Sequence, residues 1–220
     1  TGVTDGADIL YRNWDGTDIH GRGPVEVVTA GLTDVEETVG AERPSIQIGT
    51  DGPMVAFTLR FLIADRRRES FLARRLSSWE VAPVSLGATG GSRGAAGARL
   101  LLGVEDQPHM VWVDDRGTAQ HKVIYTWDGS GTGAPVSPQC AGDADMPAAA
   151  MLGGELFVVY VTSGACSSHA DSKGIVVQRI GGAAEVLTAE PLFAGDTTRY
   201  PRPDLAATAD GRLVATWVSS

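Results

Sequence analysis

Short apolar segments with alternating polar positions, separated by turns that contain Gly, Pro and Asp, run through the whole chain. Residues 200–220 predict a short strand, a tight Asp-Gly turn and a second strand that ends on an aromatic residue, and they show no helical period. Residues 43–57 and 146–160 repeat this design, and residues 98–112 are a degenerate copy without the Pro and the turn Gly. The pattern predicts a hairpin that recurs along the chain.

A second kind of strand pair alternates with this hairpin. We predict four such pairs, at residues 8–14 with 25–29, 70–79 with 81–86, 121–127 with 134–137, and 174–180 with 185–191. Together the two kinds form units of about 50–55 residues with four short strands each, which is the signature of a β-propeller blade. We therefore expect an all-β fold, a β-propeller of four-stranded antiparallel blades.

The chain is expected to form one domain. The repeat predicts a half-blade over 1–42, blades over 43–95, 96–142 and 143–197, and a closing half-blade over 198–220. The two half-blades are complementary, so we expect strands in 202–220 to pair with strands in 8–29 and to close a ring of about four blades. Closure hides sheet edges that otherwise invite another chain. The alternative is half of a larger propeller, completed by additional chain or by a second copy in a homo-oligomer.

One region fits a helix as well as strands. Phe61, Leu62, Phe71, Leu72 and Leu76 have the spacing of an amphipathic helix. We expect a long hairpin instead, because the flanking repeats require strands at this point. The arginines between residues 66 and 75 form the only basic patch of the sequence, and such a run usually marks a solvated face.

Composition narrows the class of partner. Hydrophobic residues make up 43% of the chain and charged residues 20%, and the formal net charge is −9. An acidic chain without clustered Lys and Arg has no general affinity for the nucleic-acid backbone. No apolar run approaches the ~20 residues that a membrane-spanning helix needs. We therefore expect a soluble protein with no nucleic-acid partner and no membrane insertion.

The two cysteines bear on the compartment. A disulfide between Cys140 and Cys166 suits an oxidising compartment, whereas two buried thiols suit a reducing one, and we expect the disulfide. The chain opens on Thr1 and shows no signal peptide, so we expect a mature or excised piece of a protein that is secreted or displayed on the cell surface.

The segment Tyr200-Pro201-Arg202-Pro203-Asp204-Leu205, followed by Asp210-Gly211-Arg212-Leu213-Val214-Ala215, resembles the first-strand signature of sialidase-like (BNR-type) β-propellers. As a repeat pattern the resemblance covers most of the chain, but as a motif it covers this segment alone. Of that family's catalytic set only Arg202 has a counterpart here, and the Asp-box turn survives only as fragments at 127–129 and 171–174. The resemblance implies a non-catalytic relative, or an unrelated propeller with the same strand pattern.

Arginines are the first candidate ligand-binding residues. The first strand of each blade lines the central channel of a propeller, so the residues just before these strands converge on one mouth. They are Arg43, Arg99, Asp145 with Met146, and Arg202. Three guanidiniums can hold a carboxylate, sulfate or phosphate through paired N–H donors. The alternative, which is the commoner role of such arginines, is pairing with Glu42, Asp145 or Asp204 to join adjacent blades.

Tryptophans are the second candidates. Trp112 and Trp217 end second strands, where we expect them to pack between blades as core residues. Trp14, Trp79 and Trp127 end third strands beside turns, so we expect them nearer the rim, where they can stack on a sugar ring, and we select Trp14 and Trp127 as ligand-binding candidates. Core or inter-blade packing is the stronger interpretation for the tryptophans, because large aromatic side chains are mostly buried.

Other motifs carry little chemistry. Cys166 and His169 supply two ligands where zinc needs four, and we expect a disulfide-pinned polar loop at this point. Aspartates at positions 5, 8, 15, 18, 143 and 145 form no complete calcium loop. The sequence contains no phosphate loop, nucleophile elbow or zinc-protease motif. We expect neither a metal nor a cofactor.

Two functions remain open. The preferred one is a non-enzymatic, extracytoplasmic propeller that binds a glycan or a protein surface or acts as a scaffold. The alternative is a sialidase-like glycoside hydrolase in which Arg43, Arg99 and Arg202 hold an anionic sugar. A fold alone does not choose between them.

Overall fold

The computed structural model describes residues 8–14, 22–32, 38–61, 68–85, 95–114, 123–130, 133–136, 144–163, 173–188, 192 and 201–218. Within these ranges the chain is all β apart from two single-turn 3₁₀ segments, η1 (Val28–Gly31) and η2 (Val104–Asp106). No helix in the described residues is long and apolar enough to span a bilayer.

Three complete four-stranded antiparallel sheets form the body of the molecule. In each sheet the strands lie in chain order, so every neighbouring pair is a hairpin. The first blade is β3 (Thr38–Gly49), β4 (Gly52–Phe61), β5 (Arg68–Arg75) and β6 (Trp79–Pro83). The second is β7 (Ala95–Leu102), β8 (Pro108–Asp114), β9 (Val123–Trp127) and β10 (Ala134–Pro135). The third is β11 (Ala144–Leu152), β12 (Glu155–Ser163), β13 (Lys173–Arg179) and β14 (Ala184–Val186).

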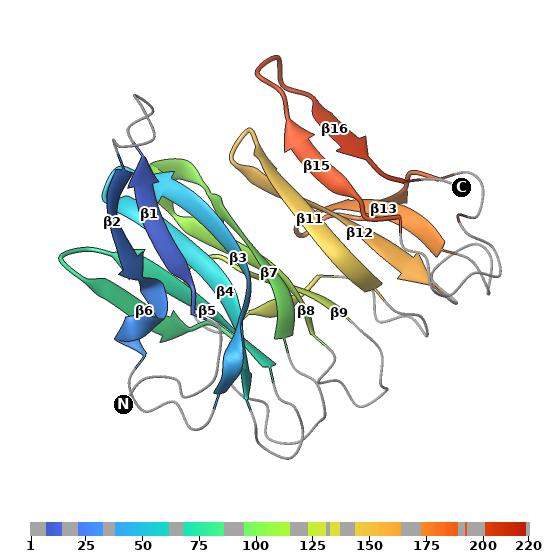
Figure 1. The fold of residues 1–220 in the computed structure, drawn as a ribbon. Helices are drawn as coiled ribbons and strands as arrows, with labels where there is room; N and C mark the ends of the chain where they lie inside the picture. The colour runs from blue at the N-terminus through green and yellow to red at the C-terminus, as the bar shows by residue number, and fades with distance from the viewer. Residues whose placement is uncertain are drawn as a thin grey trace.

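A two-stranded sheet flanks these blades on each side. The N-terminal half-blade is β1 (Leu10–Trp14) with β2 (Arg22–Val27), and the C-terminal half-blade is β15 (Asp204–Ala207) with β16 (Leu213–Thr216). Figure 1 shows the sheets in chain order across the molecule, with the first strands β3, β7, β11 and β15 following one another. Successive members of this series are in contact. The fold is a β-propeller of four-stranded antiparallel blades, as the repeat predicted.

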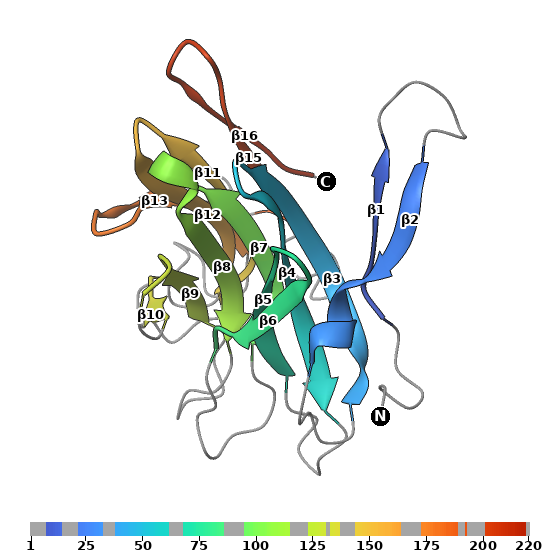
Figure 2. The same ribbon diagram turned by 90° about the vertical axis from the view of Figure 1, so that its left-hand side faces the viewer.

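The predicted closure of the ring is wrong for this chain. In the described part of the molecule β1 pairs with β2 and β15 pairs with β16, in two separate sheets. Figure 1 shows the two half-blades at opposite ends of the row, and Figure 2 shows the N-terminal half-blade from the other side. The physical reason is that packing between successive sheets sets the rotation from blade to blade, and the blades present here do not carry the ends back to each other.

Apolar layers between successive sheets form the core. Alternate residues of each second strand point to opposite sheet faces, so Phe57 packs toward the N-terminal half-blade while its neighbour Ala56 packs toward the second blade. In the second blade, Trp112 packs toward the first blade and its neighbour Val111 packs toward the third blade. Each second strand therefore contributes to two core layers, and its residues from Met54 to Leu59 in the first blade are all buried.

Polar contacts between first strands add to this packing. The Leu100 amide donates to Ser45 Oγ at 3.1 Å, and Gln47 Nε2 donates to the Leu100 carbonyl at 3.2 Å. At the far end of the same strands the amide and hydroxyl of Thr50 donate to Asp106 Oδ2 at 2.5 and 2.6 Å. These contacts join the first and second blades along the C-terminal half of β3 and at the turn that follows it.

The hairpin expected in place of a helix is confirmed where the structure describes it. Phe71 and Leu72 lie in β5 and Phe61 ends β4, and the two strands pair over their length. The basic patch is not wholly solvated, because Arg75 pairs with Glu26 of the N-terminal half-blade.

Candidate functional site

The first strands β3, β7 and β11 each contain a β-bulge, and residues 202–203, just before β15, hold the equivalent position. At this point two residues of the first strand face one residue of the second strand, and the ladder register shifts accordingly. The leading bulge residue has a positive φ in all four repeats: Arg43 (53°), Gly97 (68°), Met146 (52°) and Arg202 (45°). We call these four residues the bulge row, and the end of the propeller that carries them the bulge end.

The bulge explains two features of the sequence repeat. The residue opposite it is the aromatic of the repeat, which lies within the second strand of each complete blade and directly after β16 in the C-terminal half-blade: Phe57, Trp112, Tyr160 and Trp217. The second bulge residue is Pro in three of the four repeats: Pro44, Pro147 and Pro203. Proline suits a position that donates no ladder hydrogen bond. The Pro and the aromatic of the repeat therefore belong to the same bulge: the Pro is its second residue, and the aromatic lies opposite it on the second strand.

The bulge row is conformationally costly. A non-glycine residue in the left-handed region loses roughly 1–2 kcal/mol relative to the usual backbone conformation. Of the described non-glycine residues with positive φ, three belong to the bulge row, and the others are Glu105 and Asp106 in η2. Residues in such conformations cluster at binding and catalytic sites, and a bulge redirects its side chain out of the ladder. The bulge end is thus the candidate functional site.

The structure places the three predicted arginines on different first strands. Arg43 on β3 and Arg202 before β15 lie in the bulge row, and both are exposed. Arg43 reaches toward the second blade, where its Nη1 atom lies 3.3 Å from the position that a Cβ on Gly97 would occupy. Arg99 is exposed but lies two residues past the leading bulge residue, opposite Val111 in the ladder. The predicted repeat is therefore offset in the second blade, where Gly97 holds the equivalent position.

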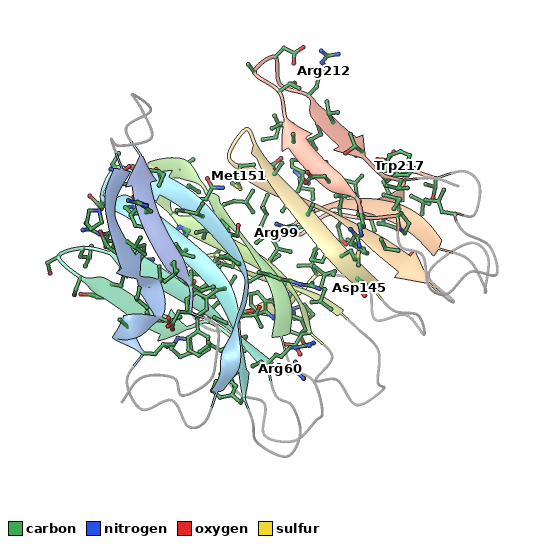
Figure 3. All side chains as sticks on the ribbon, in the orientation of Figure 1. Arg60, Arg99, Asp145, Met151, Arg212 and Trp217 are labelled. Atoms are coloured by element: carbon green, nitrogen blue, oxygen red, sulfur yellow. The ribbon has the colours of Figure 1, made fainter. Side chains whose placement is uncertain are left out.

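The alternative in which these arginines join blades by ion pairs finds no support among the described contacts. No ion pair of Arg43, Arg99 or Arg202 occurs in the part of the chain that the structure describes. Asp145 Oδ1 instead accepts from the Met146 amide at 2.8 Å, and Asp204 Oδ1 accepts from the Leu205 amide at 3.0 Å. Figure 3 shows Arg99 on β7 and Asp145 at the start of the neighbouring strand β11.

Buried polar residues lie at the same end of the sheets, and sequence reasoning missed them. Second strands run back toward the bulge end, where Thr58, Asp114 and Thr162 are buried. Within the described residues the hydroxyls of Thr58 and Thr162 have no hydrogen-bond partner. Asp114 accepts a hydrogen bond of 3.4 Å from Trp112 Nε1, and Glu69 on β5 is a second buried carboxyl. A polar residue directly after an apolar run is the sequence signal that marks these positions.

The tryptophans divide differently from the prediction. Trp112 is buried between blades, as expected. Trp79, expected near the rim, is buried instead, because its ring packs edge-on against Tyr11 and its Nε1 donates to Glu26 at 3.0 Å. Trp217, expected in the core, is 37% exposed because the described chain supplies no strand beside it. Trp127 is half-buried against the second core layer. The side chain of Trp14 lies outside the described residues.

Most of the remaining candidate residues lie outside the part of the chain that the structure describes. Cys140, Cys166, the loop 166–171 and three of the four histidines lie outside the described residues, so the disulfide stays a prediction. No group of three or more His, Cys, Asp or Glu within metal-binding reach occurs in the described residues. Asp8 accepts from the Thr29 hydroxyl at 2.6 Å, which is a structural contact.

Comparison with known proteins supports the fold. No protein-family model matches the chain, and no curated protein matches it by sequence. Among solved structures, the α-L-arabinofuranosidase from Fusarium graminearum in complex with an iminosugar inhibitor is 13% identical with a TM-score of 0.52, covering 96% of this chain and 67% of that one. The α-L-arabinanase from Penicillium chrysogenum complexed with arabinobiose is 15% identical with a TM-score of 0.51, covering 89% and 65%.

A third similar structure belongs to a family of mannoside phosphorylases that contains glycoside hydrolases targeting β-1,2-mannosidic linkages in Candida mannan. It is 10% identical with a TM-score of 0.50, covering 84% of this chain and 61% of that one. The chain thus spans about two thirds of the length of these structures. In fold it is a β-propeller of the kind found in glycoside hydrolases, and none of the three is specifically a sialidase.

Proposed function

We propose that this chain is a non-catalytic, extracytoplasmic β-propeller that binds carbohydrate at its bulge end, with a preference for acidic sugars. The observation that carries the proposal is the bulge row, in which strained bulges turn the exposed side chains of Arg43 and Arg202 out of the ladder. Guanidiniums bind carboxylates through paired N–H donors, and they donate equally well to sugar hydroxyls. Among the described residues no ion pair occupies the N–H donors of these two arginines, so the donors are available to a ligand.

The fold supports the same proposal. The similar propellers from Fusarium graminearum and Penicillium chrysogenum are described in complex with an iminosugar inhibitor and with arabinobiose. A likeness of this degree concerns the scaffold, so the ligand class here is argued from the arginines. The net charge of −9 disfavours binding of acidic ligands over most of the surface. The arginines at the bulge end would therefore direct an acidic ligand to that end.

Binding of an acidic oligosaccharide, such as an oligogalacturonide, and of its neutral counterpart tests the proposal by calorimetry. Arg43→Ala and Arg202→Ala should each weaken binding of the acidic ligand roughly tenfold, because a charge-assisted hydrogen bond contributes ~1.5–3 kcal/mol. Arg212→Ala is the matched control, since Arg212 is exposed and lies in the turn of the β15–β16 hairpin (Figure 3), at the other end of β15 from Arg202. Equal effects of all three variants, or no binding by the parent chain, would reject the proposal.

A glycoside hydrolase is the second candidate, in the sialidase-like form suggested by Arg202 or in another form. The buried carboxyls of Asp114 and Glu69 near the bulge end favour it, since glycosidases use a pair of carboxyl groups. Turnover of fluorogenic sialosides and arabinofuranosides, lost in Arg202→Ala or Asp114→Asn, would establish this candidate and exclude the non-catalytic one. Folding of Asp114→Asn is checked by circular dichroism.

A further inference from the structure

Each complete blade contains the same cross-strand pair opposite its bulge. The aromatic of the second strand faces a third-strand residue: Phe57 faces Phe71, Trp112 faces Tyr125, and Tyr160 faces Val176. The first two pairs are stacked rings with centroids 5.7 and 5.9 Å apart. The three second-strand aromatics are fully buried. Burial of this aromatic therefore depends on a third strand beside it.

Trp217 occupies the aromatic position in the C-terminal half-blade but has no such strand. In the described residues β16 pairs with β15 alone. The amide of Val218 donates to the Pro201 carbonyl at 2.7 Å, so the backbone of Val218 faces β15. Backbone groups of consecutive strand residues point to opposite edges. The N–H and C=O of Trp217 therefore face the open edge of β16, beside its exposed indole.

The N-terminal half-blade has the pattern of third and fourth strands. In each complete blade the amide of the residue directly after the fourth strand donates to the carbonyl at a fixed place in or beside the third strand. The pairs are Val84 to Ser70, Val136 to Ile124, and Leu187 to Ile175. The amide of Val28 donates to the Ile9 carbonyl in the same way, at 2.8 Å. This contact sets β1 in the register of a third strand, and it makes Leu10 the equivalent of Phe71, Tyr125 and Val176.

Leu10 has the position of the third-strand residue that faces the aromatic in each complete blade, and Trp217 has no such residue beside it in the described chain. The Leu10 side chain is 62% exposed, and its backbone faces the open edge of β1 because that of Ile9 faces β2. Both residues thus present free backbone groups and an exposed apolar side chain at the positions that meet in the complete blades. Leu10 is on β1 and Trp217 directly follows β16, and these strands belong to separate sheets at opposite ends of the row of sheets (Figure 1).

We propose that β1–β2 of a second copy of this chain docks against the open edge of β16, with Leu10 of one copy opposite Trp217 of the other. The docked hairpin completes a four-stranded blade, β15-β16-β1-β2, in the antiparallel order of the other three. A strand added at an open edge gains the backbone hydrogen bonds of a ladder. Two reciprocal contacts of this kind close a ring of two copies, since a head-to-tail contact that closes gives a cyclic assembly.

Side chains on β3 also need a neighbour that the second copy provides. Ile46 is 48% exposed, although its equivalents Leu100 and Leu205 are 2% and 7% exposed. Each of those equivalents lies beside the first strand of the preceding blade, and β3 alone among the four has no preceding first strand in the described chain. In the proposed assembly β15 of the second copy occupies that place and covers Ile46.

Disulfide trapping between two differently tagged copies tests the proposal. A mixture of Leu10→Cys protein and Trp217→Cys protein should give a mixed, reducible dimer. A mixture of Leu10→Cys with Val186→Cys should not, since Val186 is 52% exposed on β14 but lies away from both open edges. Absence of the mixed dimer overturns the proposal. So does a cross-link that forms only inside one chain of the Leu10→Cys/Trp217→Cys double variant, since it would mean that the chain closes on itself.

Sedimentation of the full chain gives an independent readout. The parent chain should sediment as a dimer, and Trp217→Asp or Leu10→Asp should convert it to a folded monomer. Val186→Asp should leave the dimer intact. Both tested side chains are exposed in the single chain, so folding is expected to survive, and circular dichroism checks it. A parent chain that stays monomeric over a wide concentration range rejects the second copy as the occupant of this edge.

Discussion

Arg75 and Glu26 join the N-terminal half-blade to the first complete blade: Arg75 Nε donates to Glu26 Oε2 at 2.6 Å, and Trp79 Nε1 donates to the same oxygen at 3.0 Å. The Arg75 hydrogen bond holds the pKa of the Glu26 carboxyl below its usual range. A carboxyl with a lowered folded-state pKa stabilises the fold above its unfolded-state pKa. This contribution is lost as the pH falls through the folded-state value.

We therefore expect Glu26→Gln to lower the free energy of unfolding at neutral pH and to reduce the loss of stability on acidification below about pH 4.5. Urea unfolding of both proteins across this range measures the difference. Glu155→Gln is the control, because Glu155 forms an exposed ion pair with Arg179 at 2.7 Å, and such pairs contribute little. Parallel pH profiles for the parent and Glu26→Gln proteins would contradict the expectation.

Gly133 leaves room for the Trp112 ring. A Cβ at position 133 would lie 2.1 Å from Cη2 and 2.6 Å from Cζ2 of Trp112, whose indole is buried and stacked on Tyr125. We expect Gly133→Ala to destabilise the protein by roughly 1–3 kcal/mol, the usual cost of overpacking a core. Thermal or urea unfolding measures it.

Two further variants test whether the destabilisation by Gly133→Ala comes from crowding of the Trp112 ring. Gly23→Ala should be close to neutral, because a Cβ there meets its nearest atom at an ordinary 3.6 Å. In a Trp112→Phe background the smaller ring frees the space, so the added cost of Gly133→Ala should largely disappear. An equal cost in both backgrounds would place its cause in the backbone and not in the ring.

Strand order and repeat could be predicted from the sequence because both are local. Alternating apolar positions and turn residues fix each hairpin, and they were sufficient to choose strands over a helix at Phe71 and Leu72. Closure of the ring could not be predicted in this way. It depends on the rotation between packed sheets, which no local pattern encodes, and complementary half-blades are equally compatible with pairing between two copies.

The position of two candidate arginines could be predicted from the sequence, and their ligand-binding role stays a prediction. Arg43 and Arg202 were selected from their place before a first strand, and the structure shows why that place is unusual: each begins a bulge with positive φ. Arg99 was assigned the same role because the second repeat lacks its Pro, which hid the two-residue offset to Gly97. The burial of Trp79 depends on Glu26 from a distant segment, so its own neighbours in sequence gave no sign of it.

Gly97 is the one glycine of the bulge row, and two constraints act on it. Its φ of 68° is left-handed, and Arg43 Nη1 lies 3.3 Å from the site of a Cβ. We expect Gly97→Ala to cost roughly 1–2 kcal/mol. Gly97→Asn should cost less, because Asn tolerates the left-handed region. Equal losses for the two variants in urea unfolding would indicate that crowding by Arg43, and not the backbone, dominates.

Tyr160 is fully buried opposite the third bulge, and its hydroxyl donates to Gln178 Oε1 at 3.1 Å. Burial raises the pKa of Tyr160 from 10.0 to about 12. A raised folded-state pKa means that the unfolded chain ionises first, so this residue makes stability fall between about pH 10 and about pH 12. Tyr160→Phe should remove that component of the alkaline loss and cost about 1 kcal/mol at neutral pH through the lost hydrogen bond.

The variant Gln178→Ala separates the effect of burial on Tyr160 from the effect of its hydrogen bond to Gln178. It leaves the buried hydroxyl of Tyr160 without its acceptor, so it should cost more at neutral pH than Tyr160→Phe, in which both the donor and the need for an acceptor disappear. Because burial and not the hydrogen bond raises the pKa, one tyrosine should still ionise only near pH 12 in this variant, as followed by phenolate absorbance. A return of that ionisation toward pH 10 would show that the hydrogen bond to Gln178 sets the pKa.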